Sequence, residues 1–171
     1  MDSINDLYEQ ATTAHNAAIH RLARGYEADP GRRRDLLQEI RIQLWRSLRL
    51  FDGRCSLQTW VYRVAHNVAA SHVMRSRRAS AHLVDLDALE GEPGFVDGEA
   101  EADRQYSLAR LLDRIHRLKP VDRQIMLLYL EGESAASIAE ITALSAANVA
   151  TKIHRIKALL NKESGEGAIH A

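Results

Sequence analysis

Two short helical patterns meet at a tight turn around residue 143, and this pair constrains the fold more than any other feature of the chain. In the first pattern the apolar positions are Ile138, Ala139 and Ile141, and in the second they are Val149, Ile153 and Ile156. Each pattern therefore has one apolar side that can pack on the other. Ser134 and Ser145 stand where each helix should begin, where a side-chain oxygen accepts from unpaired amides. The segment predicts a helix-turn-helix.

The other side of the second helix is polar and faces away from its partner. It carries hydrogen-bonding and cationic side chains, namely Asn148, Thr151, Lys152 and Arg155. Such side chains contact phosphates and base edges when a helix lies in the major groove. The pattern favours DNA binding, and the alternative is an ordinary helical hairpin with a solvated polar face.

Composition limits the class of protein. The 171-residue chain has three prolines and few runs of β-branched residues, which favours an all-α fold. A single cysteine excludes a disulfide framework or a zinc site built on cysteines. The chain has no apolar run long enough to span a bilayer, and its first residues do not resemble a secretion signal. We expect a cytoplasmic protein.

The net charge of zero is the sum of three unlike segments. Residues 1–78 hold 13 Arg and 8 acids, residues 79–103 hold 8 acids and no Lys or Arg, and residues 104–171 hold 10 basic and 7 acidic residues. The acidic segment also contains glycines and a proline and lacks the apolar content to fold alone. We therefore expect two small helical domains, over residues 1–79 and 104–164, joined by an acidic flexible linker over residues 80–103 and followed by a tail over 165–171.

The N-terminal block predicts three helices, over residues 4–26, 32–50 and 56–78. Gly25 and the turn at residues 29–31 should end the first helix. The apolar positions expected to face inward are Leu7, Ala11, Ala14, Ala18, Leu22 and Tyr26 in the first helix, Leu36, Ile40, Leu44 and Leu48 in the second, and Trp60 or Val61, Val64, Val68 and Val73 in the third.

A loop over residues 51–60 precedes the third helix and combines aromatic, polar and glycine residues. Aromatic faces and Arg stack on exposed bases, while flanking cations hold the backbone. Outward positions on the third helix follow one polar stripe, namely Arg63, Asn67, Ser71, Arg75 and Arg78. The loop and the stripe together predict a site for an unstacked base. The alternative places Phe51 and Trp60 in the core as anchors of the helix start.

These motifs resemble those of a known family. The segments 35–45, 51–53, 59–68 and 75–78 resemble conserved region 2 of bacterial sigma factors of the extracytoplasmic-function (ECF) group, which belong to the sigma-70 family. The run over residues 118–132, with the helix-turn-helix that follows, resembles region 4 of the same group. The resemblance covers about residues 5–79 and 104–163, with the motifs in the family's order.

The resemblance implies a subunit of RNA polymerase that directs the enzyme to promoters and has no catalytic step of its own. By position, binding to the polymerase core falls on Asp35, Leu36, Gln38, Glu39 and Arg41. Recognition and melting of the −10 element falls on Asp52, Gly53, Arg54, Ser56, Trp60, Arg63, Asn67 and Arg75. Recognition of the −35 element falls on Ser145, Asn148, Thr151, Lys152 and Arg155. Core polymerase, promoter DNA and an anti-sigma factor are the implied partners, with no cofactor and no membrane insertion.

Some positions depart from the family's usual pattern. Ala143 stands where the turn usually has Gly, and a left-handed conformation there costs an L-residue about 1 kcal/mol or more. Asn148 and Ala150 stand where Thr and Lys are common, so the second helix carries fewer cations. Residues 32–34 are three arginines in a stretch that is often acidic, next to the expected core-binding face. The acidic linker lies where the family's connection runs toward the RNA exit path, and the alternative for it is a solvated spacer.

Two other functions compete with this interpretation. One is a helix-turn-helix regulator that binds DNA without polymerase, which normally needs a dimer to span two half-sites. No dedicated dimerisation helix is evident in the sequence. The other is an enzyme, but the eight histidines are scattered and no metal-binding or phosphate-binding motif occurs. We therefore expect neither a catalytic residue nor a metal site.

Overall fold

The computed structural model describes the backbone of residues 2–82 and 99–166 and the side chains of residues 4–79 and 103–161. Within these residues the chain forms α-helices, one 3₁₀ turn and no strand. The elements are α1 (Asp2–Tyr26), α2 (Pro30–Ser47), η1 (Leu48–Leu50), α3 (Leu57–His82), α4 (Glu99–Arg117), α5 (Pro120–Leu130), α6 (Ala135–Thr142) and α7 (Ala146–Glu166). None of the described helices is long and apolar enough to cross a membrane.

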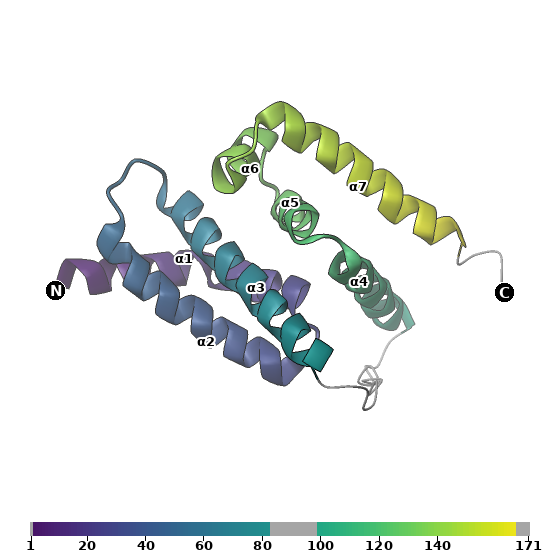
Figure 1. The fold of residues 1–171 in the computed structure, drawn as a ribbon, viewed down its shortest axis with the longest axis horizontal. Coiled ribbons are helices and arrows are strands. Elements are labelled where there is room, and N and C mark those ends of the chain that lie inside the picture. The colour runs from purple at the N-terminus through teal and green to yellow at the C-terminus, as the bar shows by residue number, and fades with distance from the viewer. Residues whose placement is uncertain (1, 83–98, 167–171) are drawn as a thin grey trace.

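The helices form two groups (Figure 1). α2 and α3 run side by side with α1 packed across them, and α4 to α7 form the second group. The groups are in direct contact, since α6 lies on α3 and both α4 and α5 touch α1. The expected all-α fold is confirmed. α3 and α4 extend into the ends of the expected linker, and its middle, residues 83–98, lies outside the described residues, as does the end of the tail.

The boundaries of α2 follow from its N-terminal cap. The Asp29 side chain accepts from the amide of Arg32 at 2.7 Å, and Pro30 occupies the first helical position, where its missing N–H is not needed. The helix therefore begins two residues earlier than we expected. It ends at Ser47 because the next three residues tighten into η1. Gly25 does not end α1 but lies inside its last turn.

The predicted core is confirmed for the second helical segment, where all four apolar positions of the expected stripe are buried, three of them in α2 and Leu48 in η1. In α3 the prediction is shifted. The buried apolar positions are Val61, which was one of two expected alternatives, Tyr62, Ala65 and Ala69, while Val64 and Val68 are only partly buried. In α1, Ala14 is exposed instead of inward, whereas Ile19 and Ala23 are buried. Small alanines let α1 and α3 approach closely, and a search for large apolar residues overlooks such contacts.

The helix-turn-helix forms as predicted. Ile138, Ile141, Val149 and Ile156 are buried, and Ala139 and Ile153 pack against them. Ser134 accepts from the amide of Ser137 at 3.1 Å, and Ser145 accepts from the amide of Asn148 at 3.2 Å. Ala143 ends α6 in the left-handed conformation, with φ 59° and ψ 27°. The turn thus has the shape that glycine usually provides, built with an alanine.

Candidate nucleic-acid interface

The expected polymerase-binding residues of α2 are exposed or half-buried, with one exception. Asp35, Gln38 and Arg41 are exposed, and Glu39 is half-buried. Leu36 has no exposed surface and belongs to the hydrophobic core. The direct contact expected for Leu36 therefore has to be corrected: on a helix packed along its apolar stripe, this residue supports the face from beneath and cannot touch a partner.

Glu39 belongs to a small charged cluster between α2 and α3. Its carboxylate accepts from Arg75 at 2.6 Å, and Nδ1 of His72 lies 3.6 Å from the same carboxylate oxygen. Nε2 of the buried His72 lies 3.5 Å from the carboxylate of Glu27, the residue that follows α1. Glu39 therefore has a structural role beside any role in binding, whereas no ion pair holds Asp35 among the described residues.

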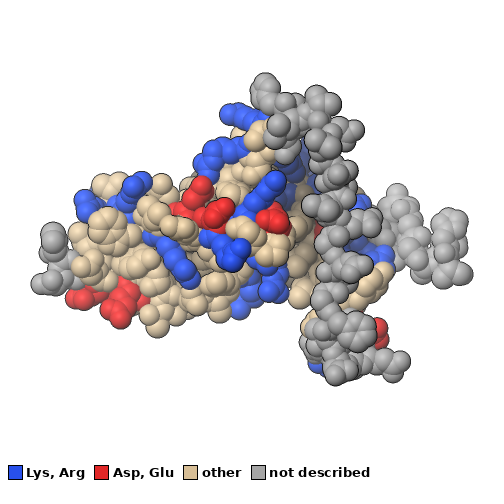
Figure 2. Space-filling model, turned by 90° about the horizontal axis from the view of Figure 1, so that it is seen from below, with Lys and Arg blue, Asp and Glu red and all other residues tan. Residues whose placement is uncertain are grey.

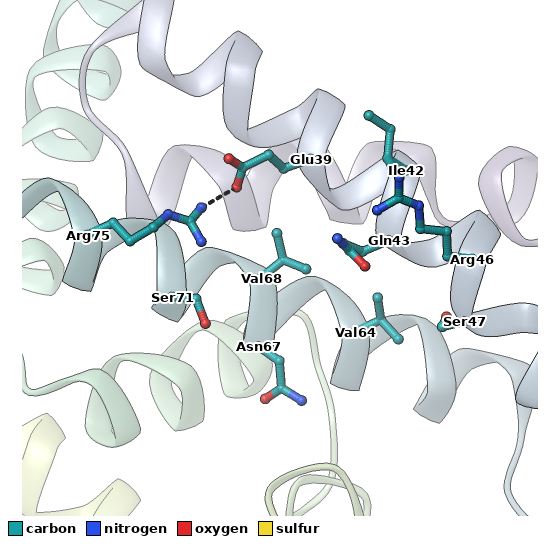
Figure 3. Close-up of a pocket in the computed structure, with 10 residues that line it drawn as sticks. All are labelled: Glu39, Ile42, Gln43, Arg46, Ser47, Val64, Asn67, Val68, Ser71 and Arg75. Carbon is teal, nitrogen blue, oxygen red and sulfur yellow. Dashed lines mark hydrogen bonds and ion pairs between the residues drawn. The ribbon is translucent and has the colours of Figure 1, made fainter.

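A groove runs between α2 and α3 beside this cluster (Figure 3). Val64 and Val68 point from α3 toward α2, while Asn67 and Ser71 point to the other side of α3. The partial burial of the two valines results from this groove. Its lining includes Gln43 and Arg46 of α2, and Glu39 and Arg75 join the two helices at one end.

The loop before α3 is held in shape by its own side chains. Asp52 accepts from the amide of Arg54 at 3.1 Å and pairs with its guanidinium at 3.0 Å, and Gly53 has a φ of 75°. The Arg54 side chain is 89% exposed, so this cation remains available to a ligand. Ser56 accepts from the amide of Thr59 at 3.0 Å and acts as the cap of α3. A polar turn with one exposed cation can hold a phosphate or a base edge.

The aromatic residues of this region anchor the loop. Trp60 packs edge-to-face on Phe51, with ring centroids 5.4 Å apart, and its Nε1 donates to the hydroxyl of Ser47 at 3.1 Å. Both rings are partly buried against the core. The structure therefore agrees with the alternative in which Phe51 and Trp60 anchor the start of the third helix. Ser47, which the sequence analysis did not identify, joins the end of α2 to the start of α3.

The polar stripe of α3 is partly engaged within the molecule. Arg63 donates to the backbone carbonyl of Glu140 in α6 at 2.7 Å, and Arg75 is paired with Glu39. Asn67 is exposed and forms no side-chain hydrogen bond with another described residue. The structure therefore presents Asn67 directly, while Arg63 has to leave α6 before it can reach DNA.

On α7 the expected DNA-facing side chains share one exposed face, but their charges are partly neutralised. Asn148, Thr151 and Arg155 are exposed. Lys152 is paired with Asp122 of α5 at 2.8 Å, and Arg155 lies 3.6 Å from the other oxygen of Asp122. No local pattern in the sequence links this acid to α7, because it lies 30 residues before Lys152.

Charge on the surface is scattered instead of forming one stripe. Figure 2 shows separate clusters of Lys and Arg on the face drawn, with acidic side chains beside several of them.

His66 lies in the core and not on this surface. Burial lowers the pKa of His66 to about 3, and its Nδ1 lies 3.0 Å from the Tyr26 hydroxyl. His66 is therefore a neutral core residue.

Comparison with known proteins agrees with this division into two parts. Residues 12–79 match the family model for sigma-70 region 2, and residues 108–160 match the model for sigma-70 region 4. The ECF RNA polymerase sigma-E factor of Haemophilus influenzae is 28% identical over 75% of this chain and 72% of its own. The RNA polymerase sigma factor YlaC of Bacillus subtilis is 26% identical over 94% of this chain and 91% of its own.

Two solved structures share the fold. CnrH, in complex with the cytosolic domain of CnrY, has a TM-score of 0.68 and 21% identity over 93% of this chain and 88% of its own. The sigma factor RpoE of Bartonella quintana, in complex with the anti-sigma factor NepR, has a TM-score of 0.69 and 17% identity over 91% of this chain and 94% of its own. At these identities the likeness concerns the fold alone.

Proposed function

The chain belongs to the sigma-70 family and is an RNA polymerase sigma factor of the ECF group, and we propose that its two domains divide promoter recognition between α3 and α7. The proposed activity is to bring core polymerase to promoters and to open them. The chemistry of RNA synthesis belongs to the polymerase. The observation that carries the assignment is the presence of regions 2 and 4 in order, each with an exposed polar helix face.

For the polymerase contact we propose the exposed part of α2, centred on Asp35, Gln38 and Arg41. These side chains lie on one exposed face of a helix whose other side is packed in the core, so the partner meets a rigid surface. Glu39 contributes at the edge of this face, where it also holds Arg75.

For the −10 element we propose the loop from Asp52 to Ser56 together with Asn67, Arg63 and Arg75 of α3. Arg54 supplies an exposed cation, and Asn67 supplies an amide that can pair with a base edge. Melting costs unstacking energy of a few kcal/mol per step, which capture of an extruded base in part offsets. Trp60 supports the loop from within.

For the −35 element we propose Asn148, Thr151 and Arg155 on the exposed face of α7. Lys152 belongs to the same site once it leaves Asp122. Ser145 caps α7, and its hydroxyl lies where a helix N-terminus favours a phosphate. We propose an anti-sigma factor as a further partner. We also propose that the protein acts in the cytoplasm, where core polymerase and promoter DNA are found.

Run-off transcription with purified core polymerase on genomic fragments tests the function. We expect specific transcripts with the wild-type protein and none with core polymerase alone. A variant with Asn67→Ala should open promoters more slowly, and a pre-melted template should rescue part of the defect. Gln10→Ala, an exposed change on α1, is the matched control and should behave like wild type. A protein that binds promoter fragments but never co-elutes with core polymerase would contradict the proposal.

The polymerase face has a separate test. Asp35→Arg should weaken co-elution with core polymerase and leave circular dichroism unchanged, because reversal of an exposed charge costs little folding energy. Asp6→Arg, an exposed acid on α1, is the matched control. Glu39→Arg is unsuitable, since the new cation would face Arg75 and His72. Unchanged polymerase affinity for Asp35→Arg would contradict the assignment of this face.

A further inference from the structure

The start of α2 carries three arginines that the proposed binding faces leave unused. Arg32 and Arg34 are exposed, whereas Arg33 is half-buried and donates to the carbonyl of Ala28 at 3.5 Å. The next residue, Asp35, is exposed and belongs to the proposed polymerase face. Neither Arg32 nor Arg34 forms an ion pair with another described residue. Both charges are therefore open to a partner.

This placement opposes the electrostatics of the helix. The unpaired amides at the start of a helix create a partial positive charge, which repels cations and favours acids. The first turn of α2 contains no acid, and Arg32 and Arg33 lie within it. The Asp29 cap accepts from the amide of Arg32, but one carboxylate faces three guanidinium groups. A sequence that breaks a local rule in this way does so where function outweighs stability.

The three arginines lie beside the basic end of α3. α2 and α3 run antiparallel, so the start of α2 is next to the end of α3 (Figure 1). The Glu39–Arg75 ion pair fixes their register. Arg34 lies five residues before Glu39 and Arg78 three residues after Arg75, or about 7.5 and about 4.5 Å from the pair in the same direction. We name the exposed cations of this surface the arginine end, which comprises Arg32, Arg34, Arg77 and Arg78.

The arginine end and the loop before α3 lie at opposite ends of this helix (Figure 1). α3 begins at Leu57, so the rise from its start to Arg78 is about 32 Å at 1.5 Å per residue. Duplex DNA rises 3.4 Å per base pair, so this span equals about nine base pairs. The exposed side chains of Asn67 and Ser71 connect the two ends. DNA that follows α3 away from the loop therefore reaches the arginine end about nine base pairs from the extruded base.

We propose that the arginine end binds the phosphate backbone of double-stranded DNA between the −10 and −35 elements, without recognition of its sequence. This proposal rests on the proposed function. The chain continues from this end of α3 to the domain with the proposed −35 helix, so the bound duplex lies upstream of the −10 element. Guanidinium groups suit this role because their paired N–H donors match phosphate oxygens.

Such a contact supplies positive charge that α7 lacks. Lys152 is paired with Asp122, and Arg155 lies 3.6 Å from the same carboxylate. Backbone contacts position a protein on DNA, whereas base contacts select the sequence. The arginine end therefore anchors the duplex, and α7 selects the −35 element with few cations of its own.

Forked DNA probes and the holoenzyme, assembled from core polymerase and the full chain, test the proposal. Both probes carry a single-stranded −10 element, and their upstream duplex has about 4 or about 14 base pairs, so that neither includes the −35 element. The wild type should bind the long probe more tightly. Arg32→Ala with Arg34→Ala should weaken binding of the long probe by roughly threefold to tenfold, lower its salt slope by up to about two units, and leave the short probe unchanged.

A matched control removes two other exposed cations. Arg110→Ala with Lys119→Ala, in the second domain, should bind both probes like the wild type. Thermal unfolding separates the proposed role from a structural one. Since cations at a helix start are unfavourable, Arg32→Ala with Arg34→Ala should keep or raise the midpoint, whereas a structural role would lower it.

Three results would overturn the proposal: equal weakening on both probes, no weakening on the long probe, or a lower unfolding midpoint. Weaker co-elution with core polymerase would assign the arginines to a protein contact and would also overturn it. A wild-type holoenzyme that binds the short probe but gains nothing from the longer duplex would contradict the upstream contact alone. A wild type that binds neither probe and yields no run-off transcript would instead contradict the proposed sigma function.

Discussion

At the scale of single residues, the backbone conformation of Ala143 lowers the stability of the folded protein directly. It adopts a left-handed conformation that an L-residue reaches only at a cost of about 1 kcal/mol or more. We expect Ala143→Gly to raise the free energy of unfolding by up to about 1 kcal/mol, less the entropy that glycine adds to the unfolded chain. Urea unfolding followed by circular dichroism measures this. Ala147→Gly, an exposed change inside α7, is the control and should destabilise by about 0.5–1 kcal/mol. A lower free energy of unfolding for Ala143→Gly would show that the backbone of Ala143 is not strained.

A second prediction at this scale concerns His66. Burial lowers its pKa to about 3, compared with 6.5 in the unfolded chain. The unfolded chain therefore binds more protons between these values, so stability rises with pH across this window and is fully present above about 6.5. The contribution of this residue is at most about 1.4 kcal/mol per pH unit.

The test compares the wild type with His66→Gln, whose amide can still pair with the Tyr26 hydroxyl. Between pH 7 and pH 5 the wild type should lose up to about 2 kcal/mol more stability than the variant. Urea unfolding at both pH values gives the difference. Equal losses would mean that His66 is protonated or hydrated in the folded protein.

At the scale of elements, the predictability of each helix depended on how its core is made. α6 and α7 were predicted well because large apolar residues recur at regular spacing and serines cap both helices. The inward stripe of α3 was predicted only in part: Val61 is buried, but the innermost positions also include Ala65 and Ala69, which carry little signal. Leu36 was expected both in the inward stripe and among the polymerase-binding residues, because a family motif marks a segment and does not show which side chains of that segment point inward; only the inward position is confirmed.

For α7, the proposed −35-binding helix, a prediction concerns Asp122 of α5. This acid pairs with Lys152 and lies near Arg155, so it withholds positive charge from the phosphates. We expect Asp122→Asn to tighten binding to all −35 sequences alike and to steepen the salt dependence by up to about one unit. Binding isotherms at several salt concentrations measure both values.

Base preference should follow other side chains of α7. Asn148→Ala or Arg155→Ala should relax preference at one or two base pairs, at about 1–3 kcal/mol each if the contact is bidentate. Asn161→Ala, exposed on the same helix, is the control. If Asp122→Asn changes neither salt slope nor affinity, the acid does not restrain the cations, and if all variants keep the wild-type preference, α7 does not recognise the −35 element.

At the scale of the whole molecule, the contact between domains could not be inferred from the sequence. Arg21 and Glu131 are 110 residues apart, and nothing in either local pattern marks the other. Gly25 was interpreted as the end of a helix, because a glycine near a turn usually has that role, but the structure shows that it makes room for Leu127. Two domains with separate motifs predict two separate bodies, and here they share one buried cluster.

This shared cluster has a consequence for unfolding that the distribution of tryptophans makes measurable. Both tryptophans, Trp45 and Trp60, lie in the N-terminal domain, so tryptophan fluorescence reports on that domain, whereas far-ultraviolet circular dichroism reports on the helices of both. Domains that share a packed interface unfold together, and their transitions then coincide. We expect one midpoint by both methods in the wild type. In Gly25→Leu the fluorescence midpoint should separate from the circular dichroism midpoint, and Leu127→Ala in the same chain should bring them closer again. Separate midpoints in the wild type would show that the domains fold independently and that the interface adds no cooperativity.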